Sequence, residues 1–300
     1  MSIRATALAA TEAVNAATHD LDALDTGAVV ALLTREQAAA VAAVEAASPA
    51  IARAVEAIVA RLAAGGTLHY VGAGTSGRLA MLDAAECPPT FGTDASLVVA
   101  HIAGGAAALV RAVEGAEDDA LAGEREMRAV GKLDAVVGIS ASGGAPYVVA
   151  AMRAARAAGA LTIGMACDSR STLAREAELA LVLETGAEPI AGSTRLKAAT
   201  AQKLVLSALS TATMIRLGKV YDNLMVDVVA TNAKLRARAL RLVVQLADVE
   251  DADARTLLER ASGSVKVAVV MSSRGLDAPA ARAALAASGG FLRPLLEPRA

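Results

Sequence analysis

Aromatic residues are nearly missing from this 300-residue chain, which has no tryptophan, three tyrosines and two phenylalanines. It therefore has few rings on which nucleobases could stack. Its 29 Lys and Arg balance 31 Asp and Glu, and no basic stripe stands out. Binding to nucleic acid needs clustered cations that displace counterions, so nucleic acid is not expected as a partner. The 55% hydrophobic content must come mainly from Ala, Val, Leu and Ile, the material of a buried core.

Cysteine and histidine are scarce as well. Cys87 and Cys167 are the only cysteines, and the three histidines, His19, His69 and His101, are scattered. Two distant thiols make neither a disulfide framework nor a zinc-binding spacing. The sequence therefore predicts no metal site.

Segments for export or membrane insertion are not found either. The N-terminus has no basic stretch followed by a compact apolar one, as a secretory signal would. The longest uncharged run, residues 135–152, contains the potential helix breakers Ser140, Ser142, Gly143, Gly144 and Pro146. These features predict a globular, cytoplasmic protein that does not enter a membrane.

The first 66 residues have the pattern of helices. Thr34–Gln37 has the form of a capping box, which marks a helix start. Ser48-Pro49 offers a second start, with an N-cap and a first-turn proline. Gly65-Gly66 is typical of a helix end.

From Thr67 onward, short apolar runs alternate with segments of helical character. This alternation is typical of βαβ units, and so of an α/β domain whose mostly parallel sheet is covered on both faces. Ligands of such sheets lie beyond the carboxyl ends of the strands, so the turns after each run are the candidates for a site. The predicted strands cover residues 68–71, 97–102, 135–139, 161–165 and 179–183, with helices over 78–86, 106–113 and 147–158.

After Gly192 the pattern is helical again. Long helices are predicted over residues 194–217 and 220–246, and short ones over 254–261, 265–271 and 279–287. The chain is thus expected to divide into an N-terminal helical segment (1–66), an α/β domain with its long helices (67–246) and a small C-terminal helical module (247–300).

The turn after the first predicted strand is Gly72-Ala-Gly-Thr-Ser-Gly-Arg78. Its glycines admit an anion close to the backbone, its hydroxyls can donate, and the following helix offers free N–H groups. The glycine spacing also fits the dinucleotide fingerprint, which wants an acidic residue at the end of the second strand. That strand ends in Ala103-Gly104-Gly105 instead. An anion-binding loop is therefore the favoured interpretation, and a plain tight turn is the alternative.

A second turn of this kind, Ser140-Ala-Ser-Gly-Gly144, follows the third predicted strand. One such turn could be structural, but two in one sheet, both rich in hydroxyls and glycine, favour a shared small anionic ligand. Neither contains the Lys of a P-loop, which argues against hydrolysis of a nucleoside triphosphate.

A third polar cluster, Gly192-Ser-Thr-Arg-Leu-Lys197, opens a long helix. Arg195 and Lys197 place two cations at a helix N-terminus, which is unfavourable unless an anion answers them. Two interpretations remain. Ser193, Arg195 and Lys197 support a ligand, or the cluster is only an N-cap followed by solvent-exposed cations.

Carboxylates near these turns are candidates for acid–base chemistry. Glu86 is expected at the C-terminal end of the helix after the first glycine loop, directly before Cys87-Pro88-Pro89, where an anion is unfavourably placed. A run of acids follows the next helical segment, and an exposed surface would also explain it. The residues alone do not show which of the four could act in catalysis: Glu114, Glu117, Asp118 and Asp119.

The longer motifs resemble the N-acetylmuramic acid 6-phosphate etherase family, whose members contain a sugar isomerase (SIS) domain. The most specific block is Glu86-Cys-Pro-Pro-Thr90 within residues 82–92. The resemblance covers nearly the whole chain and also rests on residues 72–79, 102–105, 112–118, 138–143, 192–198, 200–206, 223–232 and 289–293, with Glu12, Asn15 and Thr18 near the start.

The resemblance implies a three-layer αβα SIS domain, usually paired as a homodimer in which one subunit completes the other's site. It implies cleavage of the D-lactyl ether of N-acetylmuramic acid 6-phosphate to N-acetylglucosamine 6-phosphate and D-lactate, in amino sugar catabolism and peptidoglycan recycling. A base removes the C2 hydrogen of the open-chain sugar, an acid protonates the departing lactate oxygen, and water then adds. Two carboxyl groups suffice, with no metal and no other cofactor.

By motif position, the resemblance makes Glu86 the acid and Glu117 the base, with phosphate contacts from Ser76, Ser140 and Ser142. The residues expected to bind the phosphosugar are Gly74, Thr75, Ser76, Gly77, Ser140, Ser142, Gly143, Ser193, Arg195 and Lys197.

Three departures from the family pattern are visible. Gly144-Ala145-Pro146 stands where Arg-Thr-Pro is more usual, which removes one possible hydroxyl contact with phosphate. Leu196 replaces a more usual Met, and His101 a more usual apolar residue. A phosphosugar aldose–ketose isomerase and a phosphosugar-responsive regulator are the alternatives, and neither would release lactate.

Overall fold

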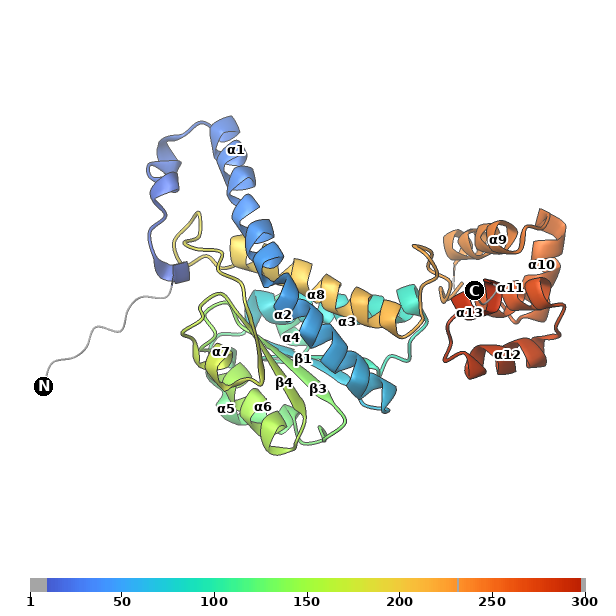
Figure 1. Cartoon of the computed structure of the whole chain (residues 1–300). Helices are drawn as coiled ribbons and strands as arrows, with labels where there is room; N and C mark the ends of the chain where they lie inside the picture. Colours follow the sequence, from blue (N-terminus) through green and yellow to red (C-terminus); the bar gives the residue numbers. More distant parts are fainter. Residues whose placement is uncertain (1–9, 231, 298–300) are drawn as a thin grey trace, which may run out of the picture. The chain divides into compact units, whose positions relative to one another are not determined.

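The computed structural model of the chain describes residues 10–230 and 232–297. These residues form two compact units (Figure 1), of which the first comprises the described residues up to Ala84 together with Ser96–Leu209. The second comprises Ala85–Ala95 together with the described residues from Ser210 onward.

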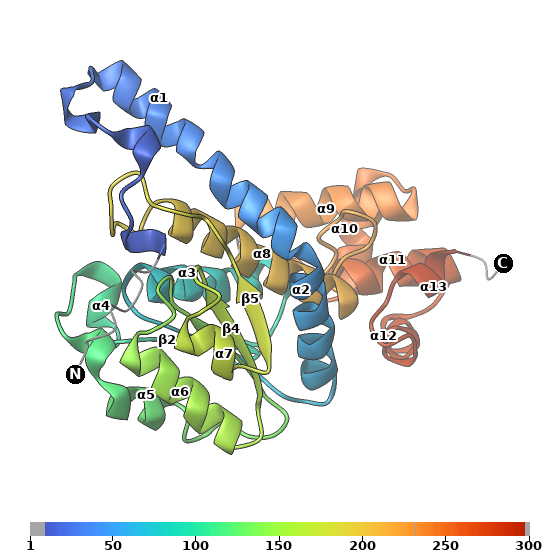
Figure 2. The ribbon, with the colours of Figure 1, turned by 60° about the vertical axis from the view of Figure 1, so that its left-hand side comes forward.

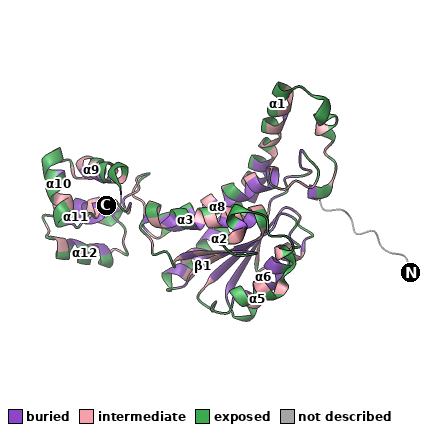
Figure 3. Cartoon of the chain, turned by 180° about the vertical axis from the view of Figure 1, so that it is seen from behind, coloured by how far each residue is buried: buried purple, intermediate pink, exposed green. Residues whose placement is uncertain are grey.

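The first unit is built on a five-stranded sheet in which every strand pair is parallel, in the order β2-β1-β3-β4-β5. Of the three strands inside the sheet, β3 and β4 are buried along their whole length, as continuous apolar runs require, and β1 is buried at all but one residue. Figure 3 shows the strands as the buried centre of this unit. The prediction of an α/β domain with a parallel sheet is confirmed, with the strands β1 (Leu68–Gly72), β2 (Val98–Ile102), β3 (Ala135–Ile139), β4 (Leu161–Ala166) and β5 (Leu179–Val182).

Helices cover both faces of this sheet (Figures 1 and 2). One face carries α5 (Ala120–Glu126), α6 (Pro146–Ala157) and α7 (Thr172–Glu176), where Tyr147 and Val148 pack against Val71 and Val136. The opposite face carries α2 (Ala38–Ala63) with the first parts of α3 (Gly74–Phe91) and α8 (Lys197–Arg216). A short helix, α4 (Ala107–Val110), follows β2.

The N-terminal helices run further than their capping signals predicted. After three 3₁₀ turns (Ala10–Glu12, Ala16–Thr18, Leu21–Ala23), Asp25 caps α1 (Thr26–Glu36) by accepting from the Ala28 N–H at 2.9 Å. The predicted starts at Thr34 and Ser48-Pro49 are wrong, because both lie inside helices. Ser48 Oγ donates back to the Val44 carbonyl at 3.2 Å instead of capping. The predicted end is confirmed, with Gly65 at φ +90°.

An uninterrupted apolar stripe explains why α2 continues past Pro49. Its buried residues recur on one side from Ala40 to Leu62, and this side packs on β5 and β4. Among the described residues, Thr26–Ala63 is also the stretch that is long and apolar enough to cross a membrane, judged by length and composition alone.

The second unit consists largely of short helices around α11 (Val265–Arg274), which is buried from Val265 to Met271. The helix predicted over 220–246 is wrong in its first half, since Asp222 has φ +52° and Tyr221 pairs with Leu224 in an isolated bridge. The three short helices that were predicted are present, and the helices around α11 are α9 (Ala233–Ala247), α10 (Asp251–Arg260), α12 (Ala278–Ala287) and α13 (Arg293–Leu296).

The compact units differ from the expected division at residue 247. The helix α9 packs against α10 and α11, with Ala239, Leu242 and Val243 buried in the same cluster. Lys266 of α11 is buried too, and its ammonium donates to Asp227 Oδ2 at 2.6 Å and to the Gly290 carbonyl at 2.8 Å. Burial lowers the pKa of Lys266, while the charge of Asp227 opposes this shift.

A histidine pair lies on the first unit's sheet. His69 Nδ1 of β1 is 3.1 Å from His101 Nε2 of β2, and His101 Nδ1 is 2.8 Å from Glu126 Oε2. Burial lowers the pKa of His69, the charge of His101 lowers it further, and Asp134 partly opposes both.

We expect acid to destabilise this unit through His69. A histidine with a lowered pKa in the folded chain takes up its proton more readily in the unfolded chain, so the free energy of unfolding falls as the pH drops below about 6.5. Urea unfolding followed by circular dichroism on both sides of that pH measures the effect. His69→Gln should reduce the pH dependence, whereas His19→Gln, at an exposed site, should keep it. An unchanged pH dependence in His69→Gln would contradict the assignment.

Candidate active site

Two loops meet at the one place in the sheet where a crevice is expected. β1 and β3 are neighbours, with Gly72 opposite Ile139 at their carboxyl ends. The chain leaves β1 toward α3 and leaves β3 toward α6, on opposite faces of the sheet (Figure 2). In sheets of this strand order, ligands bind at such a switch point. The structure therefore brings residues 72–77 and 140–144 to the same edge.

Close backbone contact sets the shape of the first loop. A Cβ on Gly72 would lie 2.7 Å from the Gly77 nitrogen, and a Cβ on Gly77 would lie 2.6 Å from Ile102 Cγ1. Gly74, where α3 begins, has φ +53°. This turn directs the free N–H groups of the first helical turn, including those of Thr75 and Ser76, to the edge of the sheet, where they can bind an anion.

The second loop arranges its own hydroxyl groups. Ser140 Oγ accepts from the Gly143 N–H at 3.1 Å, and Ser142 Oγ accepts from the Gly144 N–H at 3.3 Å. Ser140 is buried and Ser142 is exposed, and their hydroxyl oxygens lie 3.4 Å apart. Each oxygen accepts a backbone hydrogen bond and one of the two hydroxyl groups can donate to the other, so at least one hydroxyl hydrogen is left to donate to a ligand.

Ser76 has a buried partner that the sequence reasoning missed. Its hydroxyl lies 2.8 Å from Gln202 Oε1, and both residues are almost completely buried. Gln202 stands in α8 between the buried residues Ala201 and Val205, within residues 200–206, which support the family resemblance but in which no site residue was predicted. A polar residue at a buried helical position was the signal that could have identified it.

The acidic candidates after β2 are separated by the structure. Asp119 is the N-cap of α5, accepting from the Ala122 N–H at 2.8 Å, and it lies 3.6 Å from Arg125. Glu117 lies in the exposed 3₁₀ turn Ala116–Asp118, which packs on α6. Of the four acids, Asp119 is therefore engaged in structure, whereas Glu114, Glu117 and Asp118 are all exposed, and the choice of Glu117 among them stays a prediction.

Arg78 connects this acidic segment to the first loop. Its guanidinium donates from Nε to the Leu109 carbonyl at 3.3 Å and from Nη2 to the Arg111 carbonyl at 3.2 Å. The cation at the start of α3 therefore fixes the chain that leads to Glu117.

Glu86 does not lie where it was predicted. The helix α3 continues through Pro88 and Pro89 to Phe91, so Glu86 is not at its C-terminal end. The Gly92 N–H accordingly donates to the Pro88 carbonyl at 2.9 Å. The argument from an unfavourable helix terminus was therefore wrong, although the Glu86 side chain is exposed, as an acid that contacts substrate must be.

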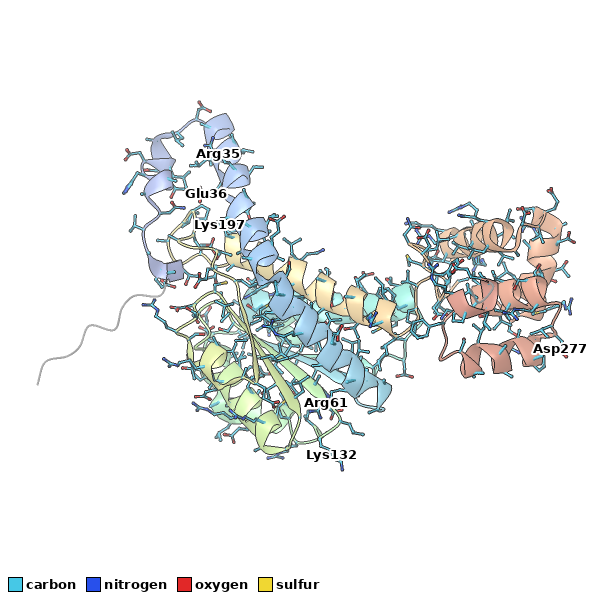
Figure 4. The ribbon with its side chains drawn as sticks, in the orientation of Figure 1. Arg35, Glu36, Arg61, Lys132, Lys197 and Asp277 are labelled. Carbon is cyan, nitrogen blue, oxygen red and sulfur yellow. The ribbon has the colours of Figure 1, made fainter. Side chains whose placement is uncertain are left out.

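The anions that pair with the N-terminus of α8 and with Lys197 are carboxylates of the chain itself. The carboxylate of Glu188, fully buried, accepts from the Lys197 N–H at 2.8 Å and from the Ala198 N–H at 2.9 Å. Lys197 Nζ, which is 5% exposed, lies 3.1 Å from Glu36 Oε2 (Figure 4). Burial raises the pKa of Glu36, but hydrogen bonds from Asn15 and Lys197 outweigh this and lower it.

These contacts correct the reasoning behind the third cluster. The Lys197 ammonium is committed to Glu36, and the first N–H groups of α8 are committed to Glu188, so neither is directed to a ligand. Ser193 is half-buried and Arg195 is exposed, and a ligand role for them stays a prediction.

The second loop is closed from behind by the turn after β4. Ser171 caps α7 through a 3.2 Å hydrogen bond from the Ala174 N–H, and its side chain packs against Gly143. A Cβ on Gly143 would lie 2.3 Å from Ser171 Oγ, and the residue has φ +65°.

Gly143→Ala should therefore distort the loop. The left-handed backbone and the clash together should lower the free energy of unfolding by about 1–3 kcal/mol and weaken binding of a phosphosugar. The matched control is Gly144→Ala, because its Cβ would meet nothing closer than Ser142 Oγ at 4.0 Å. Denaturant unfolding and calorimetric titration of both variants measure the difference. Equal behaviour of the two variants would contradict the proposed constraint.

Comparison with known proteins agrees with this architecture. Residues 50–156 match the model of the glucokinase regulatory protein N-terminal SIS domain, and residues 109–212 match the SIS domain model. A phosphoheptose isomerase from Francisella tularensis superposes with a TM-score of 0.51 at 19% identity, covering 63% of this chain and 97% of that one. At that identity the likeness shows the fold alone, which is a three-layer SIS fold.

Relatives in sequence are much closer. N-acetylmuramic acid 6-phosphate etherases from Salmonella dublin and Salmonella typhi are each 50% identical to this chain over 285 residues. The matches cover 94% of this chain and 96% of each relative.

Proposed function

The chain belongs to the N-acetylmuramic acid 6-phosphate etherase family, and we propose that it cleaves the D-lactyl ether of that phosphosugar at the loops after β1 and β3. The products are N-acetylglucosamine 6-phosphate and D-lactate. The observation that supports this most directly is the pairing of two hydroxyl- and glycine-rich loops at the switch point of the sheet.

The two loops together form what we call the phosphate cradle, residues 72–77 and 140–144. Its donors are the hydroxyl groups of Ser76, Ser140 and Ser142 and the free N–H groups at the start of α3. A phosphate monoester presents oxygen acceptors in several directions, which suits donors that converge from two loops. Ala145 supplies no hydroxyl group, so the backbone and the three serines carry this recognition.

Acid–base chemistry by two carboxyl groups follows from the substrate. Glu117 removes the C2 proton of the open-chain sugar, which the C1 aldehyde acidifies. The electron pair forms the C2–C3 double bond, the C3–O bond breaks, and Glu86 gives its proton to the departing lactate oxygen. Water then adds at C3 and a proton returns to C2. Ser193 and Arg195 are proposed to contact the sugar or its lactyl carboxylate, and Lys197 to act through the structure of the α8 start.

The length of α3 supports the proposal of a homodimer. This helix is continuous from Gly74 to Phe91, and twelve residues place Glu86 roughly 18 Å beyond Gly74 along its axis. From phosphorus to the lactyl oxygen the substrate spans at most about 8 Å, at ~1.5 Å per bond. A substrate with its phosphate at the start of α3 therefore leaves about 10 Å between its lactyl oxygen and the backbone of Glu86 in the same chain. We propose that Glu86 acts on the substrate held by a second copy.

The chemistry also defines the setting of the enzyme. A phosphorylated substrate and a product that enters amino sugar metabolism belong to the cytoplasm, in recycling of peptidoglycan fragments. We propose this location for the chain, with a phosphosugar and a second copy of itself as its partners.

Substitution of each carboxylate should block a different step. Glu86→Gln should abolish lactate release but still exchange the C2 hydrogen with deuterated solvent, because the base Glu117 is intact. Glu117→Gln should lose both the exchange and the lactate release. Lactate assay and proton NMR of N-acetylmuramic acid 6-phosphate separate these outcomes, and wild-type lactate release also rules out an isomerase or a regulator. Exchange that survives in Glu117→Gln would mean that another base acts.

Mixing the two variants tests the shared site. If each site combines Glu117 of one copy with Glu86 of the other, a mixed dimer of Glu86→Gln and Glu117→Gln contains one intact site. Lactate release should then rise from near zero toward about a quarter of the wild-type rate, given random pairing. Each variant alone is the control. If every site were complete within one chain, no mixture would recover activity.

A further inference from the structure

The contact between Ser76 and Gln202 raises a question of hydrogen direction. Ser76 stands in the first turn of α3 and Gln202 in the second turn of α8, and their side chains are 8% and 1% exposed. The two side chains are joined by a hydrogen bond of 2.8 Å from Ser76 Oγ to Gln202 Oε1. A hydroxyl group has one hydrogen, and here that hydrogen is donated to the amide oxygen.

This arrangement leaves one buried group unsatisfied. Gln202 Nε2 is buried and finds no hydrogen-bond partner among the described residues. A buried N–H group without an acceptor is costly, and such groups are rare in folded proteins. At the same time Ser76 has no hydrogen left for a phosphate, whose ionised oxygens only accept.

A half-turn of the amide changes both partners' roles. The oxygen and nitrogen of a glutamine amide have nearly the same shape, so the rotation needs no repacking. Nε2 then donates to Ser76 Oγ, and the Ser76 hydrogen is free to point out of the contact toward a phosphate oxygen. Ligand binding supplies the acceptor that makes this orientation favourable.

The other two cradle serines show what such a donor achieves. Ser140 and Ser142 each accept from a backbone N–H, that of Gly143 and that of Gly144, so neither oxygen depends on its own hydrogen for this contact. Ser76 has no equivalent backbone donor in the described contacts. The Gln202 amide is placed to supply that hydrogen bond from a side chain.

We infer that Gln202 is a positioning residue for phosphate recognition, which turns its amide to donate to Ser76 and so directs the Ser76 hydroxyl to the phosphate. This inference depends on the proposed function, because it takes the cradle as the phosphate site. It adds a residue of α8 to a site otherwise built from the β1 and β3 loops.

Two substitutions at this position separate positioning from packing. Gln202→Glu keeps the size of the side chain, but an ionised carboxylate only accepts hydrogen bonds. The Ser76 hydroxyl must therefore keep donating to residue 202 and cannot donate to a phosphate. Gln202→Met removes both donor and acceptor and leaves Ser76 unrestrained. Binding of N-acetylglucosamine 6-phosphate, by isothermal titration calorimetry, should weaken about tenfold in Gln202→Glu and less in Gln202→Met. Lowering the pH should restore Gln202→Glu relative to wild type, because a protonated carboxyl group can donate.

The matched control is Gln37, a glutamine whose amide oxygen accepts from another residue of α8. Thr200 Oγ1 donates to Gln37 Oε1 at 2.8 Å, outside the cradle, so Gln37→Glu should bind like wild type. Ser76→Ala should weaken binding, and adding Gln202→Glu to it should cause no further loss. Circular dichroism confirms that each variant is folded.

Each outcome decides a different statement. If Ser76→Ala weakens binding but Gln202→Glu does not, the inference about Gln202 is overturned and the cradle stands. If Gln202→Met loses as much as Gln202→Glu, in parallel with lost stability, Gln202 only packs, and the inference is again overturned. If neither Ser76→Ala nor Ser140→Ala affects binding, the proposed phosphate site itself is wrong.

Discussion

The approach of two glycine backbones at the end of β1 is the constraint on which the site depends. Gly72 and Gly77 lie so close that a side chain on either would meet the backbone of the other. Only this contact allows α3 to start directly at the carboxyl edge of the sheet, with its free N–H groups beside the loop after β3. Any widening of the turn would move Ser76 away from Gln202 and Arg78 away from the carbonyl groups that it holds.

The sheet and its loops could be predicted from the sequence because local patterns determine them. Residues 135–139 form an apolar run of strand length followed by Ser and Gly, and both the strand and the polar turn were recognised from that. Gly74 and Gly143 could also be predicted as loop residues from the sequence, since glycine between a strand and a helix is typical of an anion-binding turn. The ends of all five strands were predicted correctly to within one residue.

What could not be predicted depended on contacts between distant segments. Thr34 and Ser48 have capping character, but the apolar stripe of α2 packs on β5 and extends the helices through both positions. From the sequence, Lys197 was a candidate for ligand binding because no acid lies next to it. Its partners in the structure, Glu188 and Glu36, are nine and 161 residues away in the chain. Gln202 was overlooked for the same reason, since only the fold brings it to Ser76, 126 residues earlier.

The fate of the nearby cations has one more consequence. Residues 72–77 and 140–144 contain no cationic side chain, Arg78 is directed to backbone carbonyls, and Lys197 is paired with Glu36. The cradle itself thus contains no formal positive charge, and a dianion within it is held mainly by directed dipoles, with the positive charge of Arg78, which neutral carbonyl groups do not cancel, next to it. Long-range charge attraction depends on ionic strength, whereas short hydrogen bonds hardly do. Recognition of the phosphate by this cradle should thus be governed mainly by the positions of its oxygens, and salt in the surroundings should weaken it mainly through the charge of Arg78.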